Sequence, residues 1–160
     1  MRVVLAPVPV SEKAELRAAM DPYLTAHADL VDPARVHGDP TEQPYFDLYW
    51  REPERIPLWI LADGRRAGFV LLNAYSPSGQ GVDRAISEFH VDPAFRRAGV
   101  GTAAALAALA TKSGQWEFQV YHANADGMAF WPRVLAIGPI SDRQEIAAED
   151  RVIHRFRSRP

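Results

Sequence analysis

A short glycine- and arginine-rich segment, Val91 to Thr102, constrains the fold of this chain more than any other part of its sequence. The run 85–91 before it has the composition of a β-strand, and the alanine-rich run 102–112 after it favours a helix. The spacing Arg-x-x-Gly-x-Gly between them predicts a strand–loop–helix unit. Glycine permits a backbone with positive φ, and a helix N-terminus offers unpaired N–H groups and partial positive charge. Such a loop is suited to bind a phosphate.

Two familiar phosphate-binding loops do not fit this segment. No lysine follows Gly101, as a Walker A loop requires, and position 104 is alanine where the dinucleotide fingerprint has glycine. A loop for ordinary nucleotides is therefore disfavoured. The glycine pair alone leaves open an ordinary strand-to-helix turn whose arginines face solvent.

Two motifs in register narrow these alternatives. The segment Val91-x-Pro93-x-x-Arg96-Arg97-x-Gly99-Val100-Gly101 resembles motif A of the GNAT superfamily of N-acetyltransferases. Downstream, Asn124-x-x-Gly127-x-x-Phe130-Trp131 is similar to the family's Asn-x-x-Ala-x-x-Phe/Leu-Tyr segment. The separation between the two segments fits the helix and strand that the family has there. The resemblance covers residues 84–135, and the flanks match only in the order of their elements.

Apolar periodicity and turn residues predict the remaining elements. We expect strands at 2–8, 58–62, 67–75, 85–91, 116–121 and 150–156, and helices at 11–27, 45–51, 102–112 and 124–135. Ser11 is expected to cap the first helix, and Asp63-Gly64 to form a hairpin turn. Because strands and helices do not alternate regularly, we expect an α/β fold of the mixed (α+β) kind, with helices on both faces of a mixed sheet.

The resemblance implies a GNAT-like fold, with a central mixed sheet of six to seven strands. It also implies that the fourth and fifth strands splay apart to admit a pantetheine arm. At 160 residues the chain has the size of one domain, so residues 1–160 are expected to form a single GNAT-like N-acetyltransferase domain.

Composition limits the class of partner. The net charge of −2 gives no case for nucleic acid or membrane binding, and the apolar runs are too short to span a bilayer. There is no cysteine, and the five histidines lack metal-ligand spacing, so no metal site is expected. The N-terminus lacks the long apolar stretch of a signal peptide, and we expect a cytoplasmic protein.

The resemblance implies that acetyl-CoA is the acyl donor, with its pyrophosphate on the backbone of the glycine loop. The residues expected to contact it are Val91, Arg96, Arg97, Ala98, Gly99, Val100, Gly101, Thr102, Asn124 and Phe130. Two of these have alternative roles. Arg97 is either a phosphate neighbour or a solvated side chain, and Asn124 also suits a helix N-cap, a role that can coexist with CoA contact.

Candidate catalytic residues lie on the strand before the loop. Acyl transfer needs a neutral amine, so a base is useful. Strict alternation would place Ile86, Glu88 and His90 on one face. The resemblance implies that an acid at the Glu88 position faces the acceptor, as general base or amine-binding carboxylate; the alternative is a solvated strand residue. His90 is a secondary candidate, with a packing role as its alternative.

One residue departs from the family pattern at a position that matters for catalysis. Trp131 stands where the family usually has the tyrosine that protonates the leaving thiolate, and indole is not an acid at neutral pH. Tyr121 is the replacement we select, with Tyr45 and Tyr49 as alternatives; a further alternative is that the thiolate leaves without an acid. Two functions therefore stay open: an acetyl-CoA-dependent N-acetyltransferase, and a non-catalytic acyl-CoA-binding module with a sensory or regulatory role.

The acceptor is expected to be a primary amine of a small molecule or peptide. Segment 29–55 carries seven acidic residues against three arginines, which would favour a cationic amine, although a solvated loop surface explains the same pattern. Tyr45, Phe46, Tyr49 and Trp50 either line a pocket or belong to the core. The resemblance also allows for a homodimer.

Overall fold

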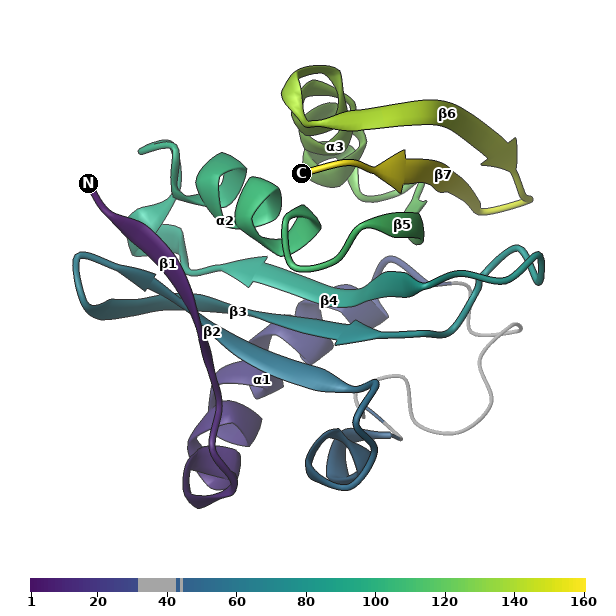
Figure 1. Cartoon of the computed structure of the whole chain (residues 1–160). Helices are drawn as coiled ribbons and strands as arrows, with labels where there is room; N and C mark the ends of the chain where they lie inside the picture. The colour runs from purple at the N-terminus through teal and green to yellow at the C-terminus, as the bar shows by residue number, and fades with distance from the viewer. Residues whose placement is uncertain (32–42, 44) are drawn as a thin grey trace.

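The computed structural model describes residues 1–31, 43 and 45–160, which form one twisted, seven-stranded mixed sheet (Figure 1). Its strand order is β1-β2-β3-β4-β5-β7-β6. The strands are β1 Val3–Pro7, β2 Ile56–Ala62, β3 Arg65–Asn73, β4 Arg84–Val91, β5 Gly114–Tyr121, β6 Ile140–Ala147 and β7 Arg151–Ser158. The α-helices are α1 Lys13–Ala28, α2 Val100–Leu109 and α3 Ala125–Ile137. The mixed sheet with helices on both faces confirms the predicted fold class.

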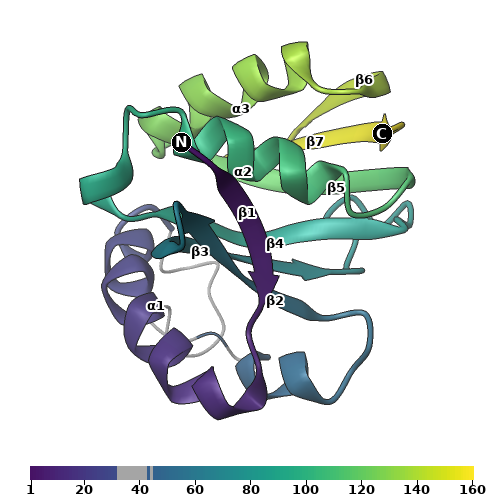
Figure 2. The same cartoon turned by 60° about the vertical axis from the view of Figure 1, so that its left-hand side comes forward.

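The helices divide between the two faces of the sheet. In Figure 2, α2 and α3 lie on one side and α1 on the other. A core cluster on the α1 side includes Leu16, Met20 and Phe69, all with no exposed surface. The larger cluster on the other side joins the sheet to α2 and α3 through residues such as Trp116 and Ala104. Both cores share the strands β2 and β3, because alternate side chains of a strand point to opposite faces.

The first four strands form an antiparallel meander. The β2–β3 hairpin turns at Asp63 and Gly64, whose φ values of 48° and 79° are those of the primed turns preferred in hairpins. This is the turn that the sequence predicts. None of the described helices is long and apolar enough to cross a bilayer.

A β-bulge interrupts β4 at Ser87. Leu71 of β3 pairs with Glu88, yet the next residue, Leu72, pairs with Ile86, so Ser87 is the extra residue. A bulge reverses the alternation of side chains that follow it. Ile86 accordingly packs in the α2–α3 core, while Glu88 reaches α1. The expectation that Ile86 shares a face with Glu88 and His90 is therefore wrong.

Beyond the bulge, β4 and β5 separate. These two strands are parallel and pair only at Arg84 with Trp116 and at Ala85 with Glu117. Ser76, Ser78 and Arg155 all donate hydrogen bonds to the buried Glu117 carboxylate, which fixes the paired end. The other end of the two strands is left open, in the manner that the family resemblance implies.

Three expected elements differ in detail. Ser11 does not cap α1; a 3₁₀ turn (η1, Val10–Glu12) precedes the helix, and its N-cap Glu12 makes no side-chain capping bond. The predicted helix 45–51 is a 3₁₀ helix (η3, Phe46–Trp50), because Pro53 and Pro57 leave no room for an α-helix to continue. Strand β6 has no counterpart among the predicted ranges, although seven strands lie within the expected number.

Candidate functional site

The glycine-rich loop adopts an unusual backbone between β4 and α2. A 3₁₀ turn (η4, Pro93–Phe95) follows the strand, and then Arg97 and Gly99 take φ values of 62° and 79°. A non-glycine residue in the left-handed region carries strain and is often found at binding loops. Gly99 is the N-cap of α2, and a Cβ added to it would meet no atom within 4 Å. The surface beside the loop is therefore open to a ligand.

Backbone N–H groups are available at this loop. The hydrogen-bond ladder of α2 begins with Ala103, whose N–H donates to the Gly99 carbonyl at 3.0 Å. The N–H groups of Val100, Gly101 and Thr102 precede it in the first turn, where an α-helix has no internal partner for them. Together with the helix dipole, these donors form an anion-binding surface.

The two arginines of the loop have different settings. Arg96 is exposed, and its Nε donates to the Val91 carbonyl at 2.8 Å, which ties the loop to the end of β4. Arg97 and Ala98 are exposed beside it. Neither guanidinium is buried, so both can reach a bound anion from the solvent side.

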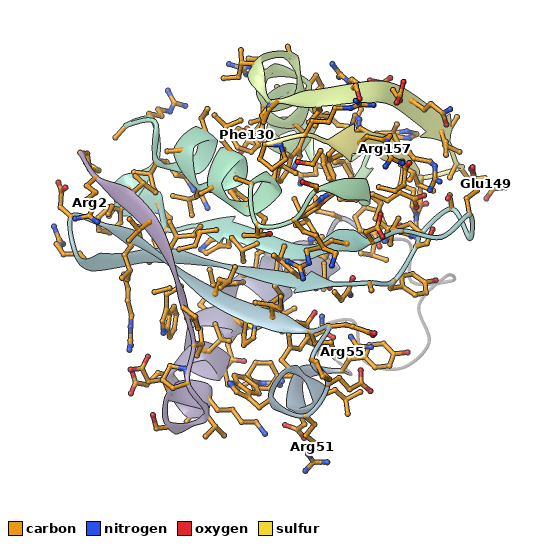
Figure 3. All side chains as sticks on the ribbon, viewed as in Figure 1. Arg2, Arg51, Arg55, Phe130, Glu149 and Arg157 are labelled. Atoms are coloured by element: carbon orange, nitrogen blue, oxygen red, sulfur yellow. The ribbon has the colours of Figure 1, made fainter. Side chains whose placement is uncertain are left out.

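An aromatic path connects the loop with the sheet. A Cβ added to Gly101 would lie 3.4 Å from the ring of Phe130, which lies between α2 and α3 (Figure 3). The Phe130 ring stacks on Phe89 of β4 at 5.8 Å between centroids, and Trp131 contacts Phe89 at 5.0 Å. The expected loop residues and Phe130 are thus brought together at one end of the opening between β4 and β5.

Asn124 caps the third helix. Its Oδ1 accepts a hydrogen bond from the Gly127 N–H at 3.0 Å, which satisfies one of the unpaired donors of α3. A Cβ added to Gly127 would lie 2.6 Å from the Asn124 amide nitrogen, so the glycine at this position makes room for the cap. Asn124 also lines the opening between the strands, which keeps its amide N–H available for a second role.

The opening between β4 and β5 is a cleft of about 230 Å³. Residues from both faces line it. Trp131 and Phe118 belong to the side of α2 and α3, while Tyr23, Glu88 and Tyr121 belong to the side of α1. Residues of both faces of the sheet therefore meet at this cleft, whereas the expected glycine-loop residues Arg96 to Thr102 do not line it.

Glu88 is held by hydrogen bonds inside the cleft. The Tyr23 hydroxyl donates to Oε2, and the Gln43 amide donates to Oε1 at 3.1 Å. Burial raises the pKa of Glu88 to about 7, although the hydrogen bonds from Tyr23 and Gln43 act in the opposite direction. Sequence reasoning selected Glu88 but missed both of its partners. The available signal for Tyr23 was its spacing from Leu16 and Met20, which puts it on the apolar face of the first helix.

His90 lies next to Glu88 on β4 but has a packing environment. Its ring lies 5.4 Å from those of both Phe69 and Tyr23, and its Nε2 is 3.1 Å from Asp92 Oδ1. Burial lowers the pKa of His90, while Asp92 acts to raise it. The side chain does not line the cleft, so its geometry agrees with the packing alternative.

Tyr121 and Trp131 both line the cleft, on opposite sides of the sheet. The Trp131 ring is largely buried among Phe118, Phe89 and Phe130, with the Phe118 centroid at 4.4 Å. The Tyr121 ring contacts His27 of α1 at 5.2 Å. Burial raises the pKa of Tyr121, so its hydroxyl keeps its proton at neutral pH.

The acidic segment 29–55 is only partly described. Asp47 forms an ion pair with Lys13 at 2.7 Å, and Glu52 one with Arg55 at 2.7 Å. Neither carboxylate lines the cleft. The acidic residues Asp32, Asp39 and Glu42 lie outside the described residues.

The aromatic residues of η3 mostly belong to the core. Phe46 and Tyr49 are buried, and the Trp50 indole donates to the Val8 carbonyl at 2.9 Å. Tyr45 is exposed and stacks on Arg55. In the part of the chain that the structure describes, no group of three histidine or acidic side chains is arranged to hold a metal ion.

Three comparisons place this geometry among known proteins. The model of the acetyltransferase (GNAT) family matches residues 23–135. No match was found among curated protein sequences. Solved structures do match, at low identity and over nearly the whole chain.

An acetyltransferase from Thermus thermophilus is 13% identical with a TM-score of 0.68, and the alignment covers 98% of this chain and 97% of that one. A GNAT-family acetyltransferase from Staphylococcus aureus is 11% identical with a TM-score of 0.67, covering 99% and 100%. The PaiA N-acetyltransferase from Thermoplasma acidophilum, in complex with coenzyme A, is 11% identical with a TM-score of 0.60, covering 96% and 98%. With the family model matching well over half of its residues, this chain belongs to the GNAT family of acetyltransferases.

Proposed function

We propose that the protein is an acetyl-CoA-dependent N-acetyltransferase that transfers an acetyl group to a primary amine of a small molecule or peptide. The observation that carries this proposal is the cleft between β4 and β5, which Glu88, Tyr121 and Asn124 line, while the glycine loop follows the end of β4 where the two strands have separated. A donor and an acceptor can enter from opposite faces and meet between the strands. The family's chemistry, and a CoA-bound structural neighbour, support the choice of donor.

The glycine loop suits the donor's pyrophosphate. N–H groups from Arg97 to Thr102 supply hydrogen-bond donors, and the exposed Arg96 and Arg97 add positive charge. The open surface at Gly99 lets a phosphate approach the backbone closely. Val91 at the strand end and the Asn124 amide offer polar groups to the pantetheine arm, and Phe130 gives it an apolar wall.

Glu88 is the candidate base. An amine must lose a proton before or during its attack on the thioester carbonyl. A carboxyl group with a pKa near 7 is ionised in part at neutral pH and accepts a proton more readily than an ordinary glutamate. Tyr23 and Gln43 orient the carboxylate from the α1 side.

Tyr121 is the candidate donor to the leaving sulfur. Its phenol stays protonated at neutral pH, because burial raises the pKa. A hydroxyl in the cleft can donate a hydrogen bond to a developing thiolate, which the Trp131 indole cannot protonate. The expected absence of a metal, the cytoplasmic location and the homodimer stay predictions.

The first prediction concerns Glu88→Gln. The amide keeps the size of the side chain but accepts no proton, so we expect acetyl transfer to fall by about a hundredfold or more. Acetyl-CoA affinity, measured by titration calorimetry, should be unchanged. Because the chain has no cysteine, a thiol-reactive dye reports released CoA alone.

Glu54→Gln is the matched control, since it makes the same change at an exposed position. Its activity should equal that of the unmodified protein. No binding of acetyl-CoA at millimolar concentration would contradict the proposed donor. Equal rates for the Glu88→Gln variant and the unmodified protein would remove Glu88 from the mechanism.

The alternative function is a non-catalytic acyl-CoA-binding module. Trp131 favours it, because the indole stands at the position of the family's usual acid. This function predicts acetyl-CoA binding without release of thiol over a broad panel of amines. Turnover above the solvent rate with any amine would exclude it.

A further inference from the structure

The α1 side of the cleft has a wall of aromatic rings. Tyr23 and His27 come from α1, Tyr121 from β5 and Tyr75 from the turn after β3, and all four line the cleft. The His27 ring lies 5.5 Å from that of Tyr23 and 5.2 Å from that of Tyr121. Tyr75 is 68% exposed, which places it at the rim. The wall faces the same side of the sheet as Glu88.

Charge on this wall is sparse. Among the described residues that line the cleft, Glu88 is the one acidic side chain, and none is a lysine or arginine. Burial lowers the pKa of His27, so its imidazole is neutral at neutral pH. Arg151 lies over the Tyr121 ring at 4.7 Å, but its charge is paired with Asp150 at 2.8 Å.

Flat, neutral rings around a single carboxylate favour an amine that carries one charge and a flat apolar body. The ammonium or amine group finds its partner in Glu88. The remainder of the molecule meets ring faces and edges, which favour an aromatic or flat apolar body over a charged one. A second charge would lose its hydration against these rings without gaining a partner there.

We propose that the acceptor is a primary monoamine attached to an aromatic or similarly flat apolar body. The amine lies at Glu88, and the body lies against His27 and Tyr121 with Tyr75 at the entrance. This inference rests on the proposed acetyl transfer and narrows its acceptor. It does not draw on the acidic residues of segment 29–55, because the carboxylates of Asp47 and Glu52 are paired outside the cleft.

The test measures kcat/KM with acetyl-CoA for phenethylamine, propylamine, putrescine, phenylalanine and a short peptide with a free N-terminus. Phenethylamine should exceed each of the others by about tenfold or more, since it alone combines one charge with an aromatic ring. A preference for putrescine, phenylalanine, propylamine or the peptide overturns the acceptor class and leaves acetyl transfer standing.

Variants of the wall make the test sharper. His27→Ala removes a ring that touches only the acceptor's body, so kcat/KM for phenethylamine should fall about tenfold while that for propylamine changes less than about twofold. Tyr75→Ala at the exposed rim should act in the same direction without risk to folding. Tyr45→Ala is the matched control, because Tyr45 is exposed but does not line the cleft. If kcat/KM falls by the same factor for phenethylamine and for propylamine in the His27→Ala and Tyr75→Ala variants, the proposal is overturned.

A failure of acetyl transfer itself has a different signature. If no amine releases thiol although acetyl-CoA binds, the proposed function is wrong. The acceptor class is then decided by calorimetric titration of phenethylamine and putrescine into the protein saturated with CoA. Binding of phenethylamine alone supports the aromatic site, and no preference overturns it.

Discussion

Glu88 is a carboxyl group whose surroundings fix its proton affinity. It is partly withdrawn from water in the cleft, and burial is the largest cause of its raised pKa. Tyr23 and Gln43 donate to its two oxygens and limit the rise. The same two contacts hold the carboxylate in one orientation, which a base needs if it is to meet the amine.

The second prediction is a pH dependence that belongs to this residue. Only the ionised carboxylate accepts a proton, so acetyl transfer should rise as the pH increases through about 7. The residual activity of the Glu88→Gln variant should lack this step. Initial rates between pH 5 and pH 9 with saturating acetyl-CoA measure both profiles. A step in the variant at the same pH would assign it to another group.

At the residue scale, the sequence suggested Glu88 as a candidate, which stays a prediction, but it did not suggest the two hydrogen-bond partners of Glu88. Tyr23 lies 65 positions away from it and Gln43 lies 45 positions away. Such contacts depend on how α1 crosses the sheet, which no local pattern encodes. Trp131 was recognised as a departure, but its burial among Phe118, Phe89 and Phe130 required the fold.

Strands β3 and β4 approach each other closely at Gly68. A Cβ added there would lie 1.9 Å from the backbone carbonyl oxygen of His90, and no rotamer change can relieve a contact with backbone. Gly68 pairs with Val91, and the adjacent Ala67 carbonyl accepts from the Asp92 N–H at 2.7 Å. The start of the glycine loop is therefore set by this close contact.

The third prediction is that Gly68→Ala destabilises the protein by about 3 kcal/mol or more, the upper end for overpacking. It should also lower activity, because β4 carries Glu88. Gly79→Ala is the control: it has a φ of +76° but open space around it, so it should cost about 1 kcal/mol and keep activity. Chemical denaturation measures both. Equal losses of stability in the Gly68→Ala and Gly79→Ala variants would contradict the role given to the close contact at Gly68.

The fourth prediction separates the two roles of Asn124 at the start of α3. Asn124→Asp keeps the oxygen that accepts from Gly127, so stability should be preserved, but the amide donor is lost and the KM for acetyl-CoA should rise. Asn124→Ala should lose both, with a cost of about 1 kcal/mol. Thermal unfolding and steady-state kinetics report the two effects. An unchanged KM in both variants would leave Asn124 as a cap alone.

At the element scale, the segment from β4 to β5 was predictable because glycine marks its turns, alanine its helix, and aromatic and β-branched residues its strands. Strand β6 was not located, since it exposes most of its side chains and its pairing is irregular after Ser141. Asp142 adopts a φ of 53° at this irregularity. Buried and exposed side chains do not alternate along this strand, so its sequence has no period of two that would predict it.

The whole molecule consists of one sheet between two separate cores. Helix α1 covers one face of the sheet and helices α2 and α3 cover the other (Figures 1 and 2). Each face has its own core, and the cleft is lined by residues of β4 and β5, which pair at one end only. Access from both faces comes with a cost to stability, because Glu88 occupies a place where an apolar side chain would pack without an ionisation penalty.

The fifth prediction concerns stability as a function of pH. In the folded chain the pKa of Glu88 is about 7, and in the unfolded chain it returns to about 4.5. Between these values unfolding releases a proton, so the free energy of unfolding should fall as the pH rises through this window. Glu88→Gln lacks the ionisation and should gain stability relative to the unmodified protein from pH 4.5 to pH 7. Urea denaturation at several pH values measures the free energy of unfolding of both proteins. A difference between them that does not change with pH would contradict the raised pKa of Glu88.

The bulge at Ser87 makes the site tolerant of one change in chain length and intolerant of another. Deleting Ser87 would remove the bulge but leave Ile86 and Glu88 as neighbours on opposite faces, so Glu88 would still point toward α1. A residue inserted after Glu88 would instead turn every side chain from there to Val91 to the other face. The strand can therefore lose its extra residue and keep Glu88 in place, whereas it cannot gain one beyond Glu88 without moving the start of the glycine loop.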